Sequence, residues 1–245
     1  PAGTFVQVMR PGYSVRLDDG EVVQLGKAKV DTLTAEEVAT RTADISRWSP
    51  SMTRAEADAW ASDSKISFDL QHGTTPAGAA GIARSGFDLE RLGTKTDMGN
   101  LGAGFYFNPA GAPSYGEAGG YGATLTVRAR VDRVMLTSSK DYARVRAVED
   151  YIDILHSNGP GQARLFLEAR VVPTTVEGRW TPSASMTNKD LIGPLSPEQI
   201  QAYLAIRQEG RISGFVFRQR ALDEGYDAVV WDFPGITLPG FPSKN

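Results

Sequence analysis

Residues 70–74 read Leu-Gln-His-Gly-Thr, and this short stretch decides how the rest of the chain is interpreted. The preceding residues, 66–71, are predicted to form a short strand that ends at His72. Residues 76–85 are predicted to form a helix, with Gly86 as its C-terminal stop. The pattern therefore delivers a histidine and a glycine at the end of a strand, directly before a helix.

An aromatic segment lies further along the chain, where residues 102–107 read Gly-Ala-Gly-Phe-Tyr-Phe. Such a segment is often a plain buried strand. The two glycines favour instead a place where the backbone approaches another group closely, because glycine has no Cβ to obstruct the approach. Ser114 and Tyr115 follow, and Tyr121 is an alternative to Tyr115 as a functional aromatic residue.

The composition excludes several other classes of protein. Of the 245 residues, 41% are hydrophobic and 22% are charged, which suits one globular domain of ordinary composition. The net charge of −3 argues against binding duplex nucleic acid through a broad basic surface. The absence of cysteine excludes a disulfide scaffold, a thiolate metal site and a cysteine nucleophile. With two histidines in the chain, no metal site is expected, and neither a membrane span nor a signal peptide is expected.

The remaining segments predict an α+β protein with few strand–helix–strand units. Residues 124–131 alternate between apolar and polar side chains, as a half-buried strand does. Alternation over residues 165–172 predicts another strand, which places Phe166, Glu168 and Arg170 on one face. Further elements are predicted to be helices at residues 142–155, from 196 onwards and at 215–223, and a last strand at 226–232.

Two parts of the chain are expected. Residues 1–64 are predicted to form an N-terminal extension, and residues 65–245 the main domain, whose last strand is expected to lie beyond Asn245. The extension is predicted to contain a β-hairpin around Gly20, because Asp-Gly lies between two apolar runs. Two short helices with capping-box starts should follow, at residues 34–48 and 53–60.

The ordered set of motifs resembles the ADP-ribosyltransferase superfamily, in its histidine–tyrosine–glutamate branch of diphtheria-toxin-like and poly(ADP-ribose)-polymerase-like enzymes. In that branch a His-Gly-Thr lies at a strand end, a glycine-rich loop leads to a strand with Gly-Phe-Tyr or Gly-Ile-Tyr, and a second tyrosine follows. The matching positions here are residues 72–74, residues 104–106 and Tyr115. The resemblance covers residues 65–130 well and residues 131–232 in outline. It implies split antiparallel sheets with peripheral helices.

The resemblance also implies that the chain binds NAD⁺ and breaks its nicotinamide–ribose bond. The backbone of Gly73 would offer one donor and one acceptor to the nicotinamide carboxamide, with no Cβ in the way. Tyr106 and Tyr115 would stack on the cationic ring. His72 would bind the ribose hydroxyls, and the Thr74 hydroxyl would orient His72.

The family further uses a glutamate on a late strand to stabilise the developing cation. After residues 225–231, where the family pattern would place it, the only acidic residue is Asp232. Three explanations are open: the catalytic strand lies beyond Asn245, Glu168 serves instead, or the site is degenerate. The first is favoured and Glu168 is second, whereas Asp232 would have to reach one methylene further.

The expected activity is mono-ADP-ribosyl transfer from NAD⁺ to a macromolecule with release of nicotinamide. A protein is the first expected target, and nucleic acid the second. The alternatives are an NAD⁺ glycohydrolase and a non-catalytic module that binds NAD⁺ or a partner. The expected setting is a toxin or secreted effector acting in the cytoplasm of a target cell, or a phage virion protein joined to a capsid module.

Overall fold

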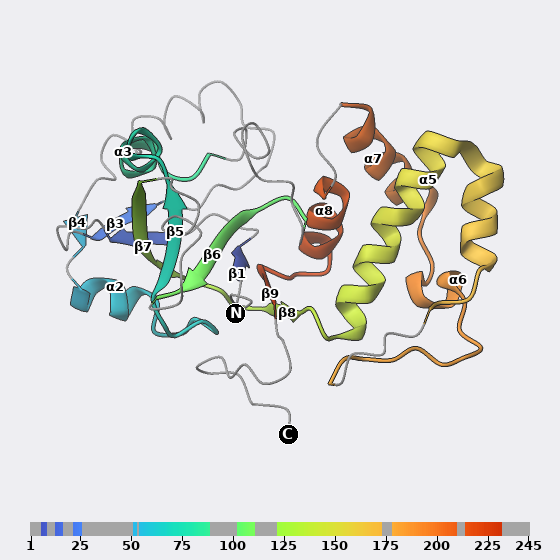
Figure 1. Cartoon of the computed structure of the whole chain (residues 1–245), viewed down its shortest axis with the longest axis horizontal. Coiled ribbons are helices and arrows are strands. Elements are labelled where there is room, and N and C mark those ends of the chain that lie inside the picture. The colour runs from blue at the N-terminus through green and yellow to red at the C-terminus, as the bar shows by residue number, and fades with distance from the viewer. Residues whose placement is uncertain are drawn as a thin grey trace.

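A computed structural model describes the chain in several stretches, with its strands gathered towards one side and most of its helices towards the other (Figure 1). The described residues are 6–8, 13–16, 22–25, 51–52, 54–88, 102–110, 122–172, 178–209 and 214–231.

The described strands form one sheet. They are β1 (Val6–Val8), β2 (Tyr13–Arg16), β3 (Val22–Leu25), β4 (Ser51–Met52), β5 (Leu70–Thr74), β6 (Phe105–Pro109), β7 (Ala123–Ala129), β8 (Val134–Leu136) and β9 (Ala228–Val230). Their order in the sheet is β4-β3-β2-β7-β5-β6-β1-β9-β8. All neighbouring pairs are antiparallel except β8 and β9. Mixed helix and mainly antiparallel sheet confirm the predicted α+β class.

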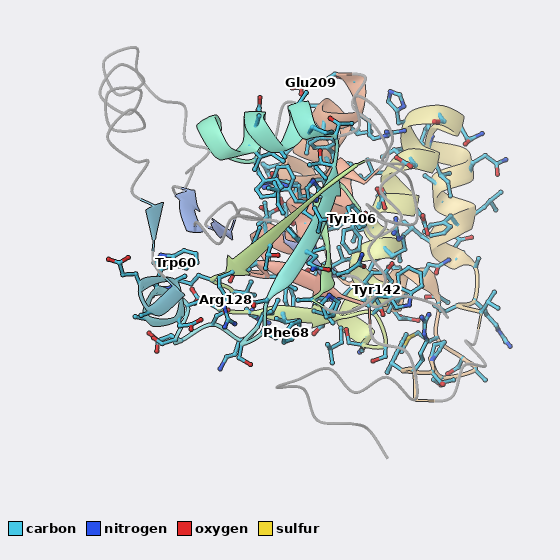
Figure 2. The ribbon with its side chains drawn as sticks, turned by 60° about the vertical axis from the view of Figure 1, so that its left-hand side comes forward. Trp60, Phe68, Tyr106, Arg128, Tyr142 and Glu209 are labelled. Atoms are coloured by element: carbon cyan, nitrogen blue, oxygen red, sulfur yellow. The ribbon has the colours of Figure 1, made fainter. Side chains whose placement is uncertain are left out.

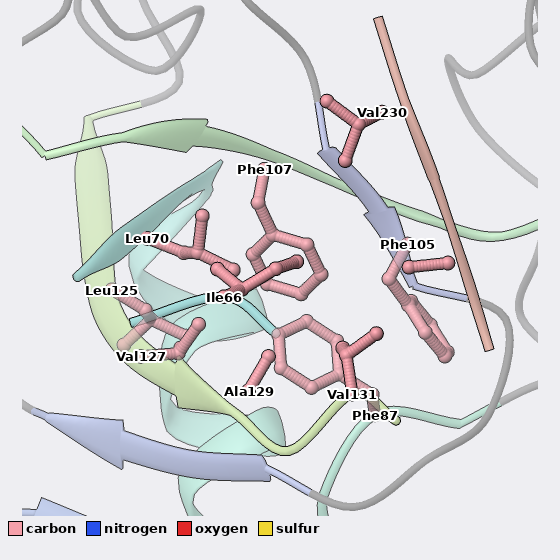
Figure 3. Packing of buried hydrophobic residues seen from close by; sticks show 11 residues of the cluster. Ile66, Leu70, Phe87, Phe105, Phe107, Leu125, Val127, Ala129, Val131 and Val230 are labelled. Atoms are coloured by element: carbon pink, nitrogen blue, oxygen red, sulfur yellow. The ribbon is translucent and has the colours of Figure 1, made fainter. Parts of the chain in front are cut away.

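The principal core lies on one face of the strands at the centre of this sheet (Figure 3). Strand β7 alternates as predicted, with Leu125, Val127 and Ala129 all buried. They pack in one cluster with Leu70 of β5 and Phe107 of β6. This burial fixes the register of the three strands, because a slip of one residue would move every apolar side chain to the opposite face.

The described helices are α2 (Arg54–Trp60), α3 (Pro76–Ser85), α5 (Lys140–Glu168), α6 (Asn188–Ile192), α7 (Pro197–Gln208) and α8 (Phe215–Asp223). Helices α2, α3 and α8 begin and end within a residue of the predicted positions and α7 begins where predicted, whereas α5 runs past its predicted end and α6 was not predicted. Helix α3 starts at Thr75, whose side chain accepts from the N–H of Gly78, and stops at Gly86 with a φ of 80°. Helices α5 to α8 pack together beside the β8–β9 end of the sheet (Figure 1).

The strand predicted at residues 165–172 is wrong, because α5 continues to Glu168. The helix is kinked at Gly159, whose φ of 80° is non-helical, and then resumes. Phe166 packs against the cluster formed by α5, α6 and α7. Arg164 and Glu168 form an i,i+4 ion pair, with both side chains largely exposed. The apparent alternation therefore combines the last turn of a helix, which has a buried face and an exposed face, with residues 169–172 beyond its end.

The N-terminal region is part of the same sheet. Strand β1 lies between β6 and β9, and β2 pairs with β7. A separate extension over residues 1–64 therefore does not describe these strands, whose partners are too distant in sequence for a local pattern to reveal. The predicted hairpin is present as antiparallel β2 and β3, and α2 corresponds to the second predicted helix. The first predicted helix, residues 34–48, lies outside the described residues.

Within the described ranges, none of the helices combines the length and the apolar composition needed to cross a membrane. In the same ranges, no three His, Asp or Glu side chains are grouped so that they could hold a metal ion.

Candidate functional site

Strand β5 pairs along its whole length with β7 but over only part of its length with β6. On β7 the pairing runs along the whole strand, from Leu70 opposite Val127 to Thr74 opposite Ala123. On β6 it covers two positions and ends with Gln71 opposite Asn108. The strands β5 and β6 therefore diverge at the point where the His-Gly-Thr motif begins.

Within the described residues, the divergence leaves the backbone of Gly73 without a ladder partner on β6. The carbonyl of Asp69 accepts from the N–H of Ala110, so it points towards the β6 side of β5. Backbone groups in a strand alternate with a period of two, which aims the N–H and C=O of Gln71 and Gly73 the same way. The next ladder pair would join Gly73 to Tyr106, but the described pairing stops before it.

The His72 side chain forms a hydrogen bond with β6 where the backbone pairing has stopped. Its Nδ1 lies 2.9 Å from the backbone carbonyl of Tyr106. Since a carbonyl only accepts, Nδ1 carries the proton and donates. Burial lowers the pKa of His72, although this hydrogen bond raises it in part, so the neutral ring is favoured near pH 7. The lone pair is thereby left on Nε2, which has no hydrogen-bond partner among the described residues.

Aromatic rings hold the imidazole in place. The ring of Phe87 meets it edge-on at 5.0 Å between centroids, and that of Phe107 is tilted at 5.5 Å. Both phenylalanines belong to the principal core. His72 thus closes the gap between β5 and β6 from the core face of the sheet and presents one nitrogen in a fixed orientation.

Tyr106 lies on the opposite face of β6. Its ring packs with the cluster that includes Met135, Phe217 and Val229, on the side of helices α5 and α8 (Figure 2). Its hydroxyl donates to the carbonyl of Gly102 at 2.7 Å. These contacts fix the ring on that face of β6.

The close approach predicted at the glycines of residues 102–104 is made by a side chain of this protein. Gly102 has a φ of 104°, and a Cβ at this position would lie 2.5 Å from Cδ1 of Phe217. Helix α8 therefore packs directly against the backbone just before β6. This contact explains Gly102 through packing alone, without a ligand.

Thr74 does not orient His72 as predicted. Its hydroxyl oxygen faces Gly78 of α3 so closely that a Cβ there would clash with it. The carbonyl of Tyr106 orients the imidazole instead. The sequence could not show this partner, because a backbone carbonyl carries no residue signature.

The structure does not bring Glu168 to this site. The residue ends α5, is exposed, and pairs with Arg164 at 2.9 Å between Nε and Oε1. The last part of α5 lies at the far side of the helices from β5 (Figure 1). Tyr115 and Asp232, the other predicted site residues, lie outside the described residues.

The arginines that cluster in sequence between residues 128 and 146 do not form one surface. Arg128 pairs with Asp58 and Asp69, at 2.7 and 2.9 Å. Arg144 pairs with Glu224, and Arg146 pairs with Glu149. These three arginines are therefore paired with carboxylates within the fold and do not form a common basic patch.

Asn108 is the residue near the opening that sequence reasoning missed. It is 4% exposed, and its Oδ1 is buried without a hydrogen-bond partner in the described part of the chain. An uncompensated buried oxygen of this kind is uncommon in folded proteins. The available signal was a polar residue that directly follows the Phe-Tyr-Phe run of β6.

Comparison of the chain with protein-family models, with curated proteins and with solved structures finds no match.

Proposed function

We propose that this protein binds NAD⁺ at the opening between β5 and β6 and transfers its ADP-ribose to a macromolecule, releasing nicotinamide. The observation that carries the proposal is the interrupted ladder at Gly73. It leaves one N–H and one C=O side by side, the pair that binds a primary carboxamide in plane. We further propose that the sheet, in which β5 and β6 diverge at this point, is of the ADP-ribosyltransferase type.

The neighbouring side chains suit the remainder of a nicotinamide riboside. The ring of Tyr106, fixed by its bond to Gly102, offers an aromatic face or edge to a flat cation. Neutral His72 offers Nε2 as an acceptor for a ribose hydroxyl. Both groups are oriented before the ligand arrives, which reduces the entropy lost on binding. Thr74 and Tyr115 are proposed only as further residues that contact NAD⁺.

The proposed reaction also needs a carboxylate to stabilise the cation that develops at the ribose. Glu168 is not placed for this role, because it ends an exposed helix and pairs with Arg164. Asp232 follows β9 by two residues in sequence and is the acidic residue of this chain that we assign to the role, unless a strand beyond Asn245 supplies a glutamate.

A non-catalytic NAD⁺-binding module is the second candidate. It is favoured by the position of Glu168, which ends an exposed helix and pairs with Arg164. Water as acceptor would make the protein an NAD⁺ glycohydrolase with the same site. In either setting proposed from the sequence, a toxin or effector or a phage virion protein, NAD⁺ would be met in the cytoplasm of the target cell.

Nicotinamide release from NAD⁺, measured with and without a lysate of candidate targets, tests this proposal. Release with label transferred to protein supports the transferase, whereas release without transfer supports the hydrolase. Binding without release supports the non-catalytic module. Absence of NAD⁺ binding at millimolar concentration overturns the proposed site. Asp232→Asn should lower release by about 10²-fold or more if Asp232 is the carboxylate.

A further inference from the structure

The side-chain carbonyl oxygen of Asn108 is buried without a hydrogen-bond partner among the described residues. The residue is 4% exposed, and its Oδ1 makes no hydrogen bond within the described residues. A carbonyl oxygen that has lost its water without gaining a donor destabilises the folded state. The chain keeps this oxygen on β6, a strand whose other described side chains are mostly apolar or aromatic. A ligand that brings a donor would satisfy it.

The position of Asn108 relates it to the opening at Gly73. Asn108 pairs with Gln71, and this is the last pair before β5 and β6 diverge. Side chains in a strand alternate between faces, so Asn108 lies on the same face as Tyr106 and opposite to Phe107. Gly73 is two residues beyond Gln71 and is therefore the diagonal neighbour of Asn108 across the gap.

A primary carboxamide of the ligand has more N–H donors than the backbone of Gly73 has acceptors for them. A primary carboxamide has two N–H donors and one oxygen acceptor. The backbone of Gly73 provides one acceptor and one donor, so one N–H of the ligand is left over. We propose that Oδ1 of Asn108 accepts this second N–H, which makes Asn108 a specificity-determining residue for nicotinamide. The inference rests on the proposed function, because it assigns a further contact within the same site.

This contact has a consequence for ligand choice. In the dinucleotide whose nicotinamide is replaced by nicotinic acid, a carboxylate replaces the carboxamide and brings no N–H. Its oxygens would face the carbonyl of Gly73 and Oδ1 of Asn108, which are both acceptors. A site built to hydrogen-bond an N–H rejects an analogue that lacks it, because the buried acceptors are then left unpaired.

The test is direct binding of NAD⁺, of the nicotinic acid dinucleotide and of ADP-ribose to three proteins, measured by calorimetry. These are the wild type, Asn108→Leu, and Asn158→Leu as the matched control at an exposed position of α5. The wild type should prefer NAD⁺ over the acid by about 10²-fold or more. Asn108→Leu should bind NAD⁺ about tenfold more weakly than the wild type, and its preference for NAD⁺ over the acid should be smaller by a similar factor. Its affinity for ADP-ribose should equal that of the wild type, and its melting temperature should be no lower. Asn158→Leu should behave as the wild type.

The outcomes separate the two proposals. If the wild type binds NAD⁺ and Asn108→Leu binds it equally well with the same preference, the role of Asn108 is overturned and the proposed function stands. If the wild type does not bind NAD⁺, both are overturned.

A second variant covers the case in which Asn108→Leu does not fold. Asn108→Asp keeps an acceptor oxygen at the same position but buries a charge. NAD⁺ should therefore raise its melting temperature by more than it raises that of the wild type, because the ligand N–H pairs with the carboxylate. A smaller rise than in the wild type contradicts the contact.

Discussion

Strand β5 is paired along its whole β7 edge, whereas its pairing along the β6 edge ends after two residues. The two edges therefore contribute differently to the fold. Along the β7 edge, backbone pairing and buried side chains such as Leu125 act together. Along the β6 edge, pairing stops at Gln71, and a histidine side chain bonds the Tyr106 carbonyl in place of Gly73. The difference teaches that a single strand can stabilise the fold along one edge and, among the described residues, leave backbone groups without ladder partners along the other.

The paired edge should show the largest effect on stability. Leu125 is 2% exposed and packs in the principal core, so Leu125→Ala should lower the free energy of unfolding by about 2–5 kcal/mol. The affinity of the folded protein for NAD⁺ should fall by less than about tenfold, because Leu125 reaches the proposed site only through His72, which lies opposite it on β5. Denaturant unfolding measures the first quantity and calorimetry the second. Leu165→Ala, at an exposed leucine of α5, is the control and should change stability by less than about 0.5 kcal/mol.

The open edge should show its largest effect on activity. His72→Ala removes the acceptor proposed for the ribose and should reduce nicotinamide release by about 10²-fold or more. The control is His156→Ala, which changes the exposed histidine of α5 and should release nicotinamide as the wild type does. If a folded His72→Ala protein releases nicotinamide as fast as the wild type, His72 has only a structural role. The β6 edge of β5 would then have no functional role that sets it apart from the β7 edge.

Tyr106 allows the ring and the hydroxyl to be separated. Tyr106→Ala should weaken NAD⁺ binding by about 1–3 kcal/mol, the size of a stacking interaction. Tyr106→Phe keeps the ring and loses only the bond to Gly102, so its main effect should be about 1 kcal/mol of stability. Equal NAD⁺ affinity in the wild type and in a folded Tyr106→Ala protein would remove Tyr106 from the site.

The fold was predictable wherever local patterns decide it. Helix α3 with its stop at Gly86, the alternation of β7 and the start of α7 at Ser196 follow from caps and periodicity. The place of β1 between β6 and β9 was not predictable, because it depends on pairing between segments distant in sequence. The end of α5 was misread, because a short run with alternating polarity fits an exposed helix as well as a strand.

The candidate site was predictable in its residue types and unpredictable in its connections. The sequence pointed to His72, Gly73 and Tyr106, and the structure places them around one interruption of the sheet. The bond from His72 to the Tyr106 carbonyl and the unpaired oxygen of Asn108 depend on backbone geometry and burial, which no motif records. Glu168 was chosen from a strand that does not form, so its proposed role was lost with that strand.

A smaller effect than that of Leu125→Ala is expected from the pH dependence that His72 contributes to stability. Burial lowers the pKa of His72 from 6.5, so the unfolded chain binds a proton at a higher pH than the folded protein does. The contribution to stability is therefore full above that value and is lost as the pH falls below it. Between about pH 7.5 and about pH 5.5 the loss should be at most about 1.4 kcal/mol. Denaturant unfolding of the wild type and of His72→Phe should show a smaller loss in the variant, and an equal loss would place the neutral form of His72 in doubt.

Amide hydrogen exchange at Gly73, measured by NMR with and without NAD⁺, tests the central claim most directly. In the free protein the N–H of Gly73 should exchange fast, whereas those of His72 and Thr74 should be protected because they point towards β7. Saturating NAD⁺ should slow exchange at Gly73 by about tenfold or more, because the carboxamide oxygen then accepts from it. Protection of Gly73 equal to that of its neighbours in the free protein, or exchange unchanged with NAD⁺ bound, would contradict an open edge that binds nicotinamide.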